Sequence, residues 1–299
     1  MHTIDDPEMA GKDLSPLFGK TYCQQQLMAT HHPGQASWVW RVDTTEGPCI
    51  VRTSRFIEPP DEDFWQGAWR LFGAHTASFK GMLWAEQVLA PISPIPLPRI
   101  RRQEFYQGRR YLVVDYLPGI PLQSFNQLSN EGITAFGRAL AIIHGIGKTV
   151  LCGTSPSGPF HTRAYPVMEY LVSRFYAEDR TCQYLWKNIA PHIDHLPPED
   201  FWSPILLDMD PSQFLTDGSQ ITALVDTELY VMAPRHLELI GLEYLLDAAH
   251  ADRFREGYET ISPLPNLCDA RPAYRFLLRL LSFQGAVDWT RWMNHSTRF

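Results

Sequence analysis

The chain has 299 residues, and its 26 basic and 33 acidic side chains give a formal net charge of −7. Apolar residues make up 44% of the sequence and charged residues 20%, proportions that suit a globular protein with a large core and exclude an intrinsically disordered chain. At about 150 residues per domain the length predicts one to two domains, and the acidic balance argues against a nucleic acid partner, because binders of the phosphate backbone normally carry a basic excess.

Three short antiparallel strands are predicted within residues 26–56, where apolar and polar residues alternate on both sides of two turn signals. The turns fall at residues 31–37 (HHPGQAS) and 43–48 (DTTEGP). Gly34 and Gly47 permit the backbone angles that such tight turns require.

A helical insertion is predicted at residues 64–89, whose helix formers and large aromatic side chains suit one or two amphipathic helices. The proline cluster at residues 91–98 ends this insertion, because proline removes backbone donors and fixes φ. Residues 99–117 then predict a hairpin around a Gln-Gly turn. The chain up to residue 117 is therefore expected to be strand-rich.

A helical region follows. Pro118 and Gly119 are typical of a hinge between two parts of a chain. Beyond them, residues 131–146 and residues 163–189 each show the spacing of apolar and aromatic side chains that predicts a helix.

One hairpin is embedded in this helical region, at residues 214–225, with its turn at Asp217-Gly218. Helices resume beyond it. The pattern predicts an α+β fold with a small antiparallel β lobe, residues 1–117, and a larger helical lobe, residues 118–299. The alternative is two unrelated domains joined at the proline-glycine hinge.

Two acids flank the embedded hairpin. Asp208 and Asp226 each follow a run of apolar residues, so each is expected to project from a buried segment into a cleft. Because a hairpin returns the chain to its starting edge, the two carboxylates are expected to converge. Buried carboxylates need a partner, and a divalent cation is a natural one.

This segment resembles the aminoglycoside phosphotransferase and choline kinase-like family, which has the bilobal protein-kinase-like fold. The family's catalytic loop runs His-Gly-Asp-x-x-x-x-Asn, and its metal-binding acid follows after a hairpin. The resemblance implies that Asp208 is the catalytic aspartate and that Gln213 and Asp226 are the metal ligands. It also implies ATP and Mg²⁺ as cofactors and a small-molecule hydroxyl compound as the substrate.

The resemblance extends into the strand-rich lobe. The stretch PGQAS is similar to the family's loop over the nucleotide phosphates, which implies contacts from Gly34 and Ser37. Arg52 takes the position of the strand cation that contacts the phosphates, and Glu86 that of its helical partner.

The resemblance also covers the connection between the lobes. Residues 111–122 (YLVVDYLPGIPL) are similar to the family's hinge, which implies that Asp115 and Leu117 lie at the nucleotide. Residues 136–146 are similar to the helix that precedes the catalytic loop.

Three positions depart from the family pattern. Leu206 stands where the family has its structural histidine, and we expect apolar packing to absorb this loss. Gln213 replaces an asparagine; its amide oxygen can still ligate a hard cation, but the extra methylene moves that oxygen by roughly an ångström, and magnesium demands near-ideal octahedral geometry. Arg52 keeps the charge of the family's lysine and adds a bidentate fork.

Three functions fit these features: an ATP-dependent small-molecule kinase, which we favour, a pseudokinase-type binding protein and a metal-dependent hydrolase. The acidic balance favours a cationic or polar hydroxyl acceptor, such as an aminoglycoside, an amino alcohol or an amino sugar. For Glu228 two interpretations stay open, a supporting acid of the site or a surface or capping residue. The sequence indicates no oligomeric state.

Other patterns predict no site. The stretch GIGKT at residues 145–149 lacks the first glycine of a phosphate-binding loop. His192 and His195 have helical spacing but no further ligands, so zinc is not expected. Arg99 and Arg101 alternate along a predicted strand and are expected to form a solvated face.

The sequence also predicts the cellular compartment. Charged residues interrupt the strongest apolar stretches well short of about 18 residues, so no membrane span is expected, and the first thirty residues lack the apolar core of a signal peptide. The five cysteines are scattered without a Cys-x-x-Cys pair, which is typical of reduced thiols. We therefore expect a cytoplasmic protein that binds no membrane.

Overall fold

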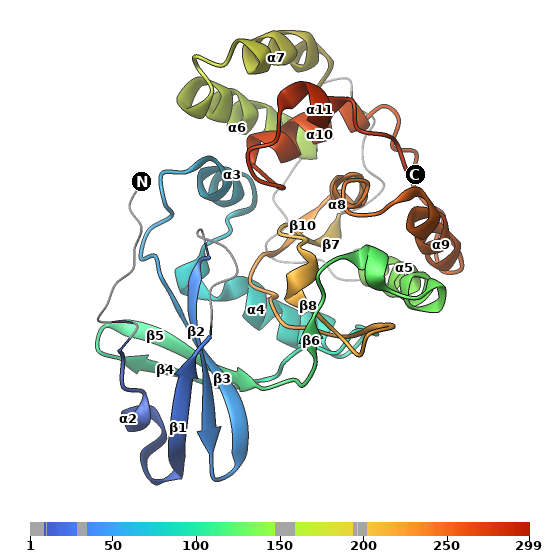
Figure 1. Cartoon of the computed structure of the whole chain (residues 1–299). Coiled ribbons are helices and arrows are strands. Elements are labelled where there is room, and N and C mark those ends of the chain that lie inside the picture. Colours follow the sequence, from blue (N-terminus) through green and yellow to red (C-terminus); the bar gives the residue numbers. More distant parts are fainter. Residues whose placement is uncertain (1–8, 10, 29–34, 147–158, 194–195, 197–201) are drawn as a thin grey trace.

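The computed structural model describes residues 9, 11–28, 35–146, 159–193, 196 and 202–299. An antiparallel sheet lies on one side of the molecule and a group of helices on the other (Figure 1). The α+β class and the two lobes predicted from the sequence are therefore confirmed.

A five-stranded antiparallel sheet forms the small lobe, with its strands in the order β1-β2-β3-β5-β4. The strands are β1 Tyr22–Leu27, β2 Ser37–Thr44, β3 Gly47–Ser54, β4 Ile100–Tyr106 and β5 Arg109–Asp115. Gln107 and Gly108, which join β4 to β5, both have positive φ, 48° and 76°, as a tight hairpin turn requires. The predicted strands are confirmed, but β1 begins before residue 26, because this edge strand exposes glutamines that hide its alternation.

Short helices accompany this sheet. They are α2 Ser15–Phe18, α3 Asp63–Phe72 and α4 Lys80–Trp84, with single 3₁₀ turns at Gly19–Thr21 and Thr76–Ser78. Helix α4 continues directly into a π-helical turn, Ala85–Leu89. The expected helical insertion is thus divided into two parts.

Seven helices build the large lobe: α5 Asn130–Gly145, α6 Phe160–Phe175, α7 Arg180–Ile193, α8 Arg235–Leu242, α9 Ala248–Glu259, α10 Arg271–Leu280 and α11 Trp289–Met293 among the described residues. Helices α5 and α9 cross closely. A Cβ on Gly137 would lie 2.1 Å from the carbonyl oxygen of Phe254, and one on Gly257 would lie 1.9 Å from that of Thr134.

The single helix expected at residues 163–189 is wrong, because the structure has α6 and α7 there. Asp179 interrupts the helix. Its Oδ1 accepts hydrogen bonds from the backbone nitrogens of Thr181 and Cys182, both at 3.0 Å. An aspartate in this position begins a new helix.

Two small sheets carry the segments that reach the cleft. One has the strand order β6-β8-β9, with β6 Ile120–Pro121, β8 Phe214–Thr216 and β9 Ile221–Leu224. The other pairs β7 Ser203–Leu206 with β10 Tyr230–Ala233. The predicted hairpin at residues 214–225 is confirmed, with Gly218 at φ 103° in its turn.

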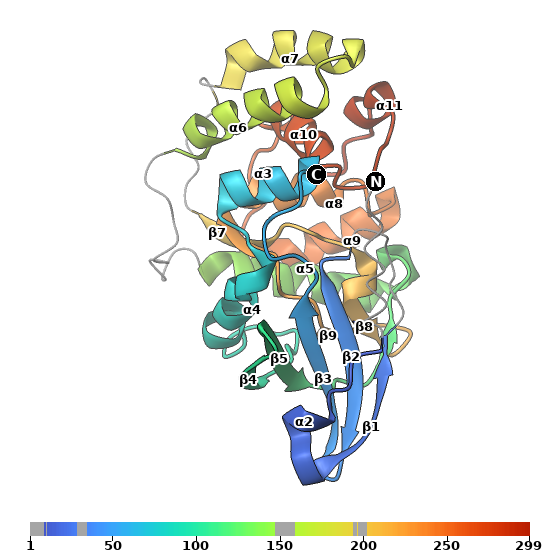
Figure 2. The ribbon, with the colours of Figure 1, turned by 90° about the vertical axis from the view of Figure 1, so that its left-hand side faces the viewer.

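Helix α3 precedes the hinge in sequence but packs on the large lobe, against α6 (Figure 2). Its buried Trp65, Ala68 and Leu71 belong to the same core cluster as the large-lobe helices. A Cβ on Gly67 would lie only 2.2 Å from the side chain of Leu281. The division at residues 117 and 118 stays a prediction.

None of the described helices is long and apolar enough to cross a membrane. Of the described cysteines, Cys49 and Cys182 are buried, Cys23 and Cys268 are exposed, and all four are free thiols.

Candidate active site

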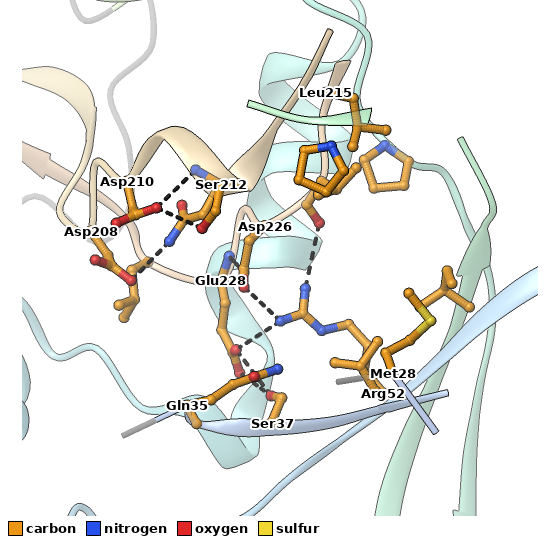
Figure 3. A pocket seen from close by; sticks show the side chains of 18 of the residues that line it. Met28, Gln35, Ser37, Arg52, Asp208, Asp210, Ser212, Leu215, Asp226 and Glu228 are labelled. Atoms are coloured by element: carbon orange, nitrogen blue, oxygen red, sulfur yellow. Dashed lines mark hydrogen bonds and ion pairs between the residues drawn. The ribbon is translucent and has the colours of Figure 1, made fainter. Parts of the chain in front are cut away.

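A cavity of about 750 Å³ is lined by residues of both lobes. It contains seven of the residues that the sequence analysis selected: Ser37, Arg52, Asp115, Leu117, Asp208, Gln213 and Asp226. Figure 3 shows how several of these side chains face one another. Gly34 lies outside the described residues.

Asp208 is held in place by the backbone that precedes it. Leu206 and Leu207 are buried in the core, and the nitrogen of Leu207 donates to the carbonyl of Leu229 at 3.0 Å. The nitrogen of Leu206 donates to Oε1 of Glu238 at 2.7 Å. The side chain of Leu206 is therefore buried in the core, as expected if apolar packing absorbs the loss of the family's histidine.

Glu238 connects this loop to helix α5. Its Oε2 lies 2.6 Å from Nε2 of His144, whose Nδ1 lies 2.7 Å from the hydroxyl of Tyr258. His144, Glu238 and Tyr258 are all buried. Because buried polar groups are expensive to leave unpaired, this chain of contacts fixes the strand that leads to Asp208.

The side chain of Gln213 is oriented by Asp208. Its Nε2 donates to Oδ2 of Asp208 at 2.8 Å. Asp210 stabilises the 3₁₀ turn Pro211–Gln213 by accepting from the nitrogen of Ser212 at 2.8 Å. The amide oxygen of Gln213 is buried and has no hydrogen-bond partner among the described residues. An unpartnered amide oxygen beside carboxylates suits a hard cation.

Asp208 has an unusual electrostatic environment. Burial raises the pKa of its carboxyl to about 7; Asp226 and Asp210 add to the rise, and the hydrogen bond from Gln213 opposes it. A carboxylate with a pKa near neutrality is suited to exchanging a proton.

Arg52, on β3, reaches across to the large lobe. Its Nη2 lies 2.8 Å from Oδ2 of Asp226 and 3.4 Å from Oε2 of Glu228 (Figure 3). Burial alone would lower the pKa of Arg52, but Asp226 and Glu228 raise it above its ordinary value. The guanidinium stays charged, and its buried Nε has no partner among the described residues.

The expected pairing of Arg52 with Glu86 is wrong. Oε1 of Glu86 accepts a hydrogen bond from the backbone nitrogen of Ile100 at 2.7 Å, and Glu86 is not among the described residues that line the cavity. The π-helical turn that contains Glu86 changes the direction of its side chain relative to a regular helix.

Glu228 is the acid that the sequence analysis did not settle. The residue is buried, and the hydroxyl of Ser37 donates to its Oε2 at 3.1 Å. Burial raises the pKa of Glu228, while Arg52 opposes the rise. Its place two residues after Asp226, in VDTE, was the only signal for its role.

The predicted hinge segment lines the same cavity. The carboxylate of Asp115 accepts from Nε of Arg99 at 3.0 Å and from Nε of Arg101 at 2.7 Å. These arginines are therefore occupied by a neighbouring acid, and the carboxylate of Asp115 is occupied as well.

Two oxygen donors of the cavity could hold a metal ion. The described residues contain no group of three or more His, Cys, Asp or Glu that could hold a metal ion. Magnesium in phosphate-transfer sites takes one or two protein ligands together with phosphate oxygens and water. The Gln213 amide oxygen and the Asp226 carboxylate fit that pattern.

The sequence matches the phosphotransferase enzyme family (APH) over residues 30–277. No curated protein matches it.

Among the solved structures with the same fold are two antibiotic phosphotransferases and a choline kinase. The macrolide 2'-phosphotransferase MphH from Brachybacterium faecium aligns with a TM-score of 0.64 at 14% identity, over 96% of this chain and 98% of that one. The GDP and kanamycin complex of APH(2")-IIia aligns at 0.64 and 11% identity, over 90% and 88%. The choline kinase LicA from Streptococcus pneumoniae aligns at 0.57 and 14%, over 93% and 91%. The chain therefore has the protein-kinase-like fold of these enzymes.

Proposed function

Because the chain belongs to the phosphotransferase enzyme family, we propose that it transfers the γ-phosphate of ATP to a hydroxyl group of a small molecule. The observation that carries this proposal is the convergence, in one cavity, of Asp208, Gln213 and Asp226 with Arg52 from the other lobe. Phosphoryl transfer asks for positioning and charge neutralisation more than for covalent chemistry. These four side chains suit both tasks.

Each side chain has a distinct role in this proposal. Asp208, in its ionised form, accepts the proton of the acceptor hydroxyl and orients that hydroxyl for in-line attack on the γ-phosphorus. Arg52 neutralises charge on the phosphates. Gln213 and Asp226 would hold magnesium, which when bound supplies positive charge beside the phosphates.

The nucleotide would extend from these residues to the hinge. Leu117 and Asp115 line that end of the cavity. Since two arginines already occupy the carboxylate of Asp115, contacts to the base are expected from the backbone of this segment. We extend the same proposal to the phosphate side, where Ser37 and Gly34 would approach the nucleotide.

The acceptor would occupy the end of the cavity near helix α3. Glu62, Asp63 and Phe64 line it there, together with the loop of residues 282–285. Among the described lining residues, Arg52 is the single cation, and it already contacts two acids. This charge distribution favours a cationic or polar hydroxyl compound over an anionic one.

Thermal unfolding with nucleotide tests the proposal. ATP with Mg²⁺ should raise the Tm strongly, and ATP without Mg²⁺ should raise it much less, because ligands that bind the folded state stabilise it. ATP consumption measured across hydroxylated cationic, neutral and anionic compounds then identifies the acceptor class. No Tm response to any nucleotide would contradict the proposal.

A nucleotide-binding protein without turnover is the second candidate. Gln213 favours it, because its amide is one methylene longer than the asparagine of the family and is engaged by Asp208. Stabilisation by ATP that is independent of Mg²⁺, with no ATP consumption, would support this alternative.

A further inference from the structure

The buried Arg52 needs a permanent anionic partner. Its side chain is 6% exposed, and a buried charge is stable only when it is paired. Asp226 is its nearest partner at 2.8 Å, but the Asp226 side chain is 34% exposed and is the carboxylate proposed to hold magnesium. A carboxylate that also binds a metal ion cannot by itself neutralise the buried charge of Arg52.

The helix that follows α3 does not supply this partner. Glu86 is engaged by the backbone of Ile100. Helix α4 instead presents Gly81 to the segment after Asp226: a Cβ there would lie 2.1 Å from the carbonyl oxygen of Glu228. The helix thus fixes the backbone of Glu228 and offers no carboxylate at that point.

Glu228 has the burial and the contacts of a permanent partner. Its side chain is 5% exposed, and its carboxylate accepts from Arg52 at 3.4 Å and from the hydroxyl of Ser37 at 3.1 Å. Its backbone nitrogen donates to Oδ1 of Asp226 at 3.3 Å. Figure 3 shows Asp226 and Glu228 on the same side of the Arg52 guanidinium, with Ser37 beside Glu228.

We propose that Glu228 is a positioning residue that holds Arg52 toward the nucleotide phosphates, in the role that the sequence had assigned to Glu86. This inference rests on the proposed function. Arg52 lines the cavity, while Glu228 bridges β2, β3 and the segment that carries Asp226.

The test compares Glu228→Gln with Glu86→Gln in the full chain, each with Arg52 and with Arg52→Gln. ATP affinity is measured by calorimetry with and without Mg²⁺, and the ligand-free Tm shows that each variant is folded. With Arg52 present, Glu228→Gln should weaken ATP binding roughly tenfold, both with and without Mg²⁺, and Glu86→Gln should leave it within about twofold. In the Arg52→Gln background, Glu228→Gln should have little further effect.

Two results would overturn the inference while leaving the proposed function intact: equal losses from Glu86→Gln and Glu228→Gln, or a Glu228→Gln loss that persists in Arg52→Gln. A loss seen only with Mg²⁺ would also overturn it and make Glu228 a metal ligand. Absence of ATP binding by the wild type would overturn both proposals together.

Ser37→Ala is the second variant, for the case in which Glu228→Gln does not fold. It removes one donor to the Glu228 carboxylate and should weaken ATP binding a few-fold more when Arg52 is present than in Arg52→Gln, where only the contact that Ser37 itself is proposed to make with the nucleotide is lost. A Ser37→Ala loss of the same size with and without Arg52 would contradict the positioning role.

Discussion

Burial, and then the neighbouring acids Asp226 and Asp210, favour the neutral form of Asp208. Its pKa of about 7 means that the folded protein binds this proton more tightly than the unfolded chain, whose aspartates titrate near 4. The stability linked to this proton is fully present below about pH 4 and is lost as the pH rises through about 7. At pH 8 the folded protein therefore carries an unfavourable ionised carboxylate.

We predict that Asp208→Asn stabilises the metal-free protein at pH 8 while abolishing turnover. The gain should be roughly 1–3 kcal/mol, with allowance for partial exposure to water, or a few degrees in Tm. It should shrink toward zero at pH 4. Tm measurements from pH 4 to pH 8 check this, and a gain that does not depend on pH would show that the cause is not the carboxylate.

Gln213 is the residue at which the chain and its family differ most sharply. Gln213→Asn should retain or raise kinase activity, because it restores the shorter amide, whereas Gln213→Ala should weaken the dependence on Mg²⁺. Initial rates measured over a range of Mg²⁺ concentrations distinguish the two. Loss of activity in both variants would show that the longer amide is required.

Two reference variants calibrate this measurement. Asp226→Ala should lose nucleotide-metal binding, because it removes the charged member of the proposed ligand pair. Asp208→Ala should keep ATP binding and lose about 10²–10⁴-fold in rate, the usual contribution of a general base. Wild-type activity in Asp208→Ala would mean that this loop is not catalytic.

Sequence reasoning located the central acids but not the second, buried acid that pairs with Arg52. Asp208, Gln213 and Asp226 were found because their order and spacing around a hairpin survive in a linear sequence. The pairing of Arg52 with Glu228 instead of Glu86 was not found. It depends on the directions in which the two glutamate side chains leave a loop and a π-helical turn. Those directions are set by packing between distant segments, and no local pattern records them.

Helix α4 meets the site through its glycine. Gly81→Ala should destabilise the protein by about 1–3 kcal/mol and weaken ATP binding, because the new methyl group would press on the backbone of Glu228. Denaturant unfolding and ATP titration check both effects. Gly145→Ala, in the last turn of α5, is the matched control, since a Cβ there meets none of the described residues within 4 Å. An equal loss in the control would refute the packing argument.

Elements with regular alternation or spacing were predictable. Strands β2, β3 and β5 and helix α5 appear where the apolar pattern placed them. The break between α6 and α7 was missed, because the aromatic spacing runs across it and only Asp179 marks a new start. A capping hydrogen bond outweighs apolar periodicity at such a point.

The two lobes are connected through helix α3 as well as through the hinge. Oδ2 of Asp63 accepts hydrogen bonds from the hydroxyls of Tyr176, at 2.5 Å, and Ser282, at 2.7 Å. Burial, followed by this carboxylate, raises the pKa of Tyr176 to about 12, so the tyrosine remains a donor. The contact fixes the part of the cavity wall that Asp63 and Ser282 line.

Asp63→Ala should therefore raise the KM for the acceptor severalfold and leave the affinity for ATP unchanged. Steady-state kinetics with each substrate varied in turn provide the measurement. Asp61→Ala is the control, because the ion pair that Asp61 forms with Arg174 is exposed and is its one ion pair among the described residues. A parallel change in both KM values for Asp63→Ala would show a general loss of lobe geometry.

The packing of α3 also constrains the order in which the chain acquires its structure during synthesis. Residues 63–72 leave the ribosome long before Leu171 and Leu281, the side chains that Gly67 approaches most closely. Until then the apolar face of α3 lacks the large-lobe helices against which it packs. Such distant contacts slow folding and delay its completion, so a nascent chain that has been synthesised only as far as the hinge would expose Trp65 and Leu71 until α10 is made.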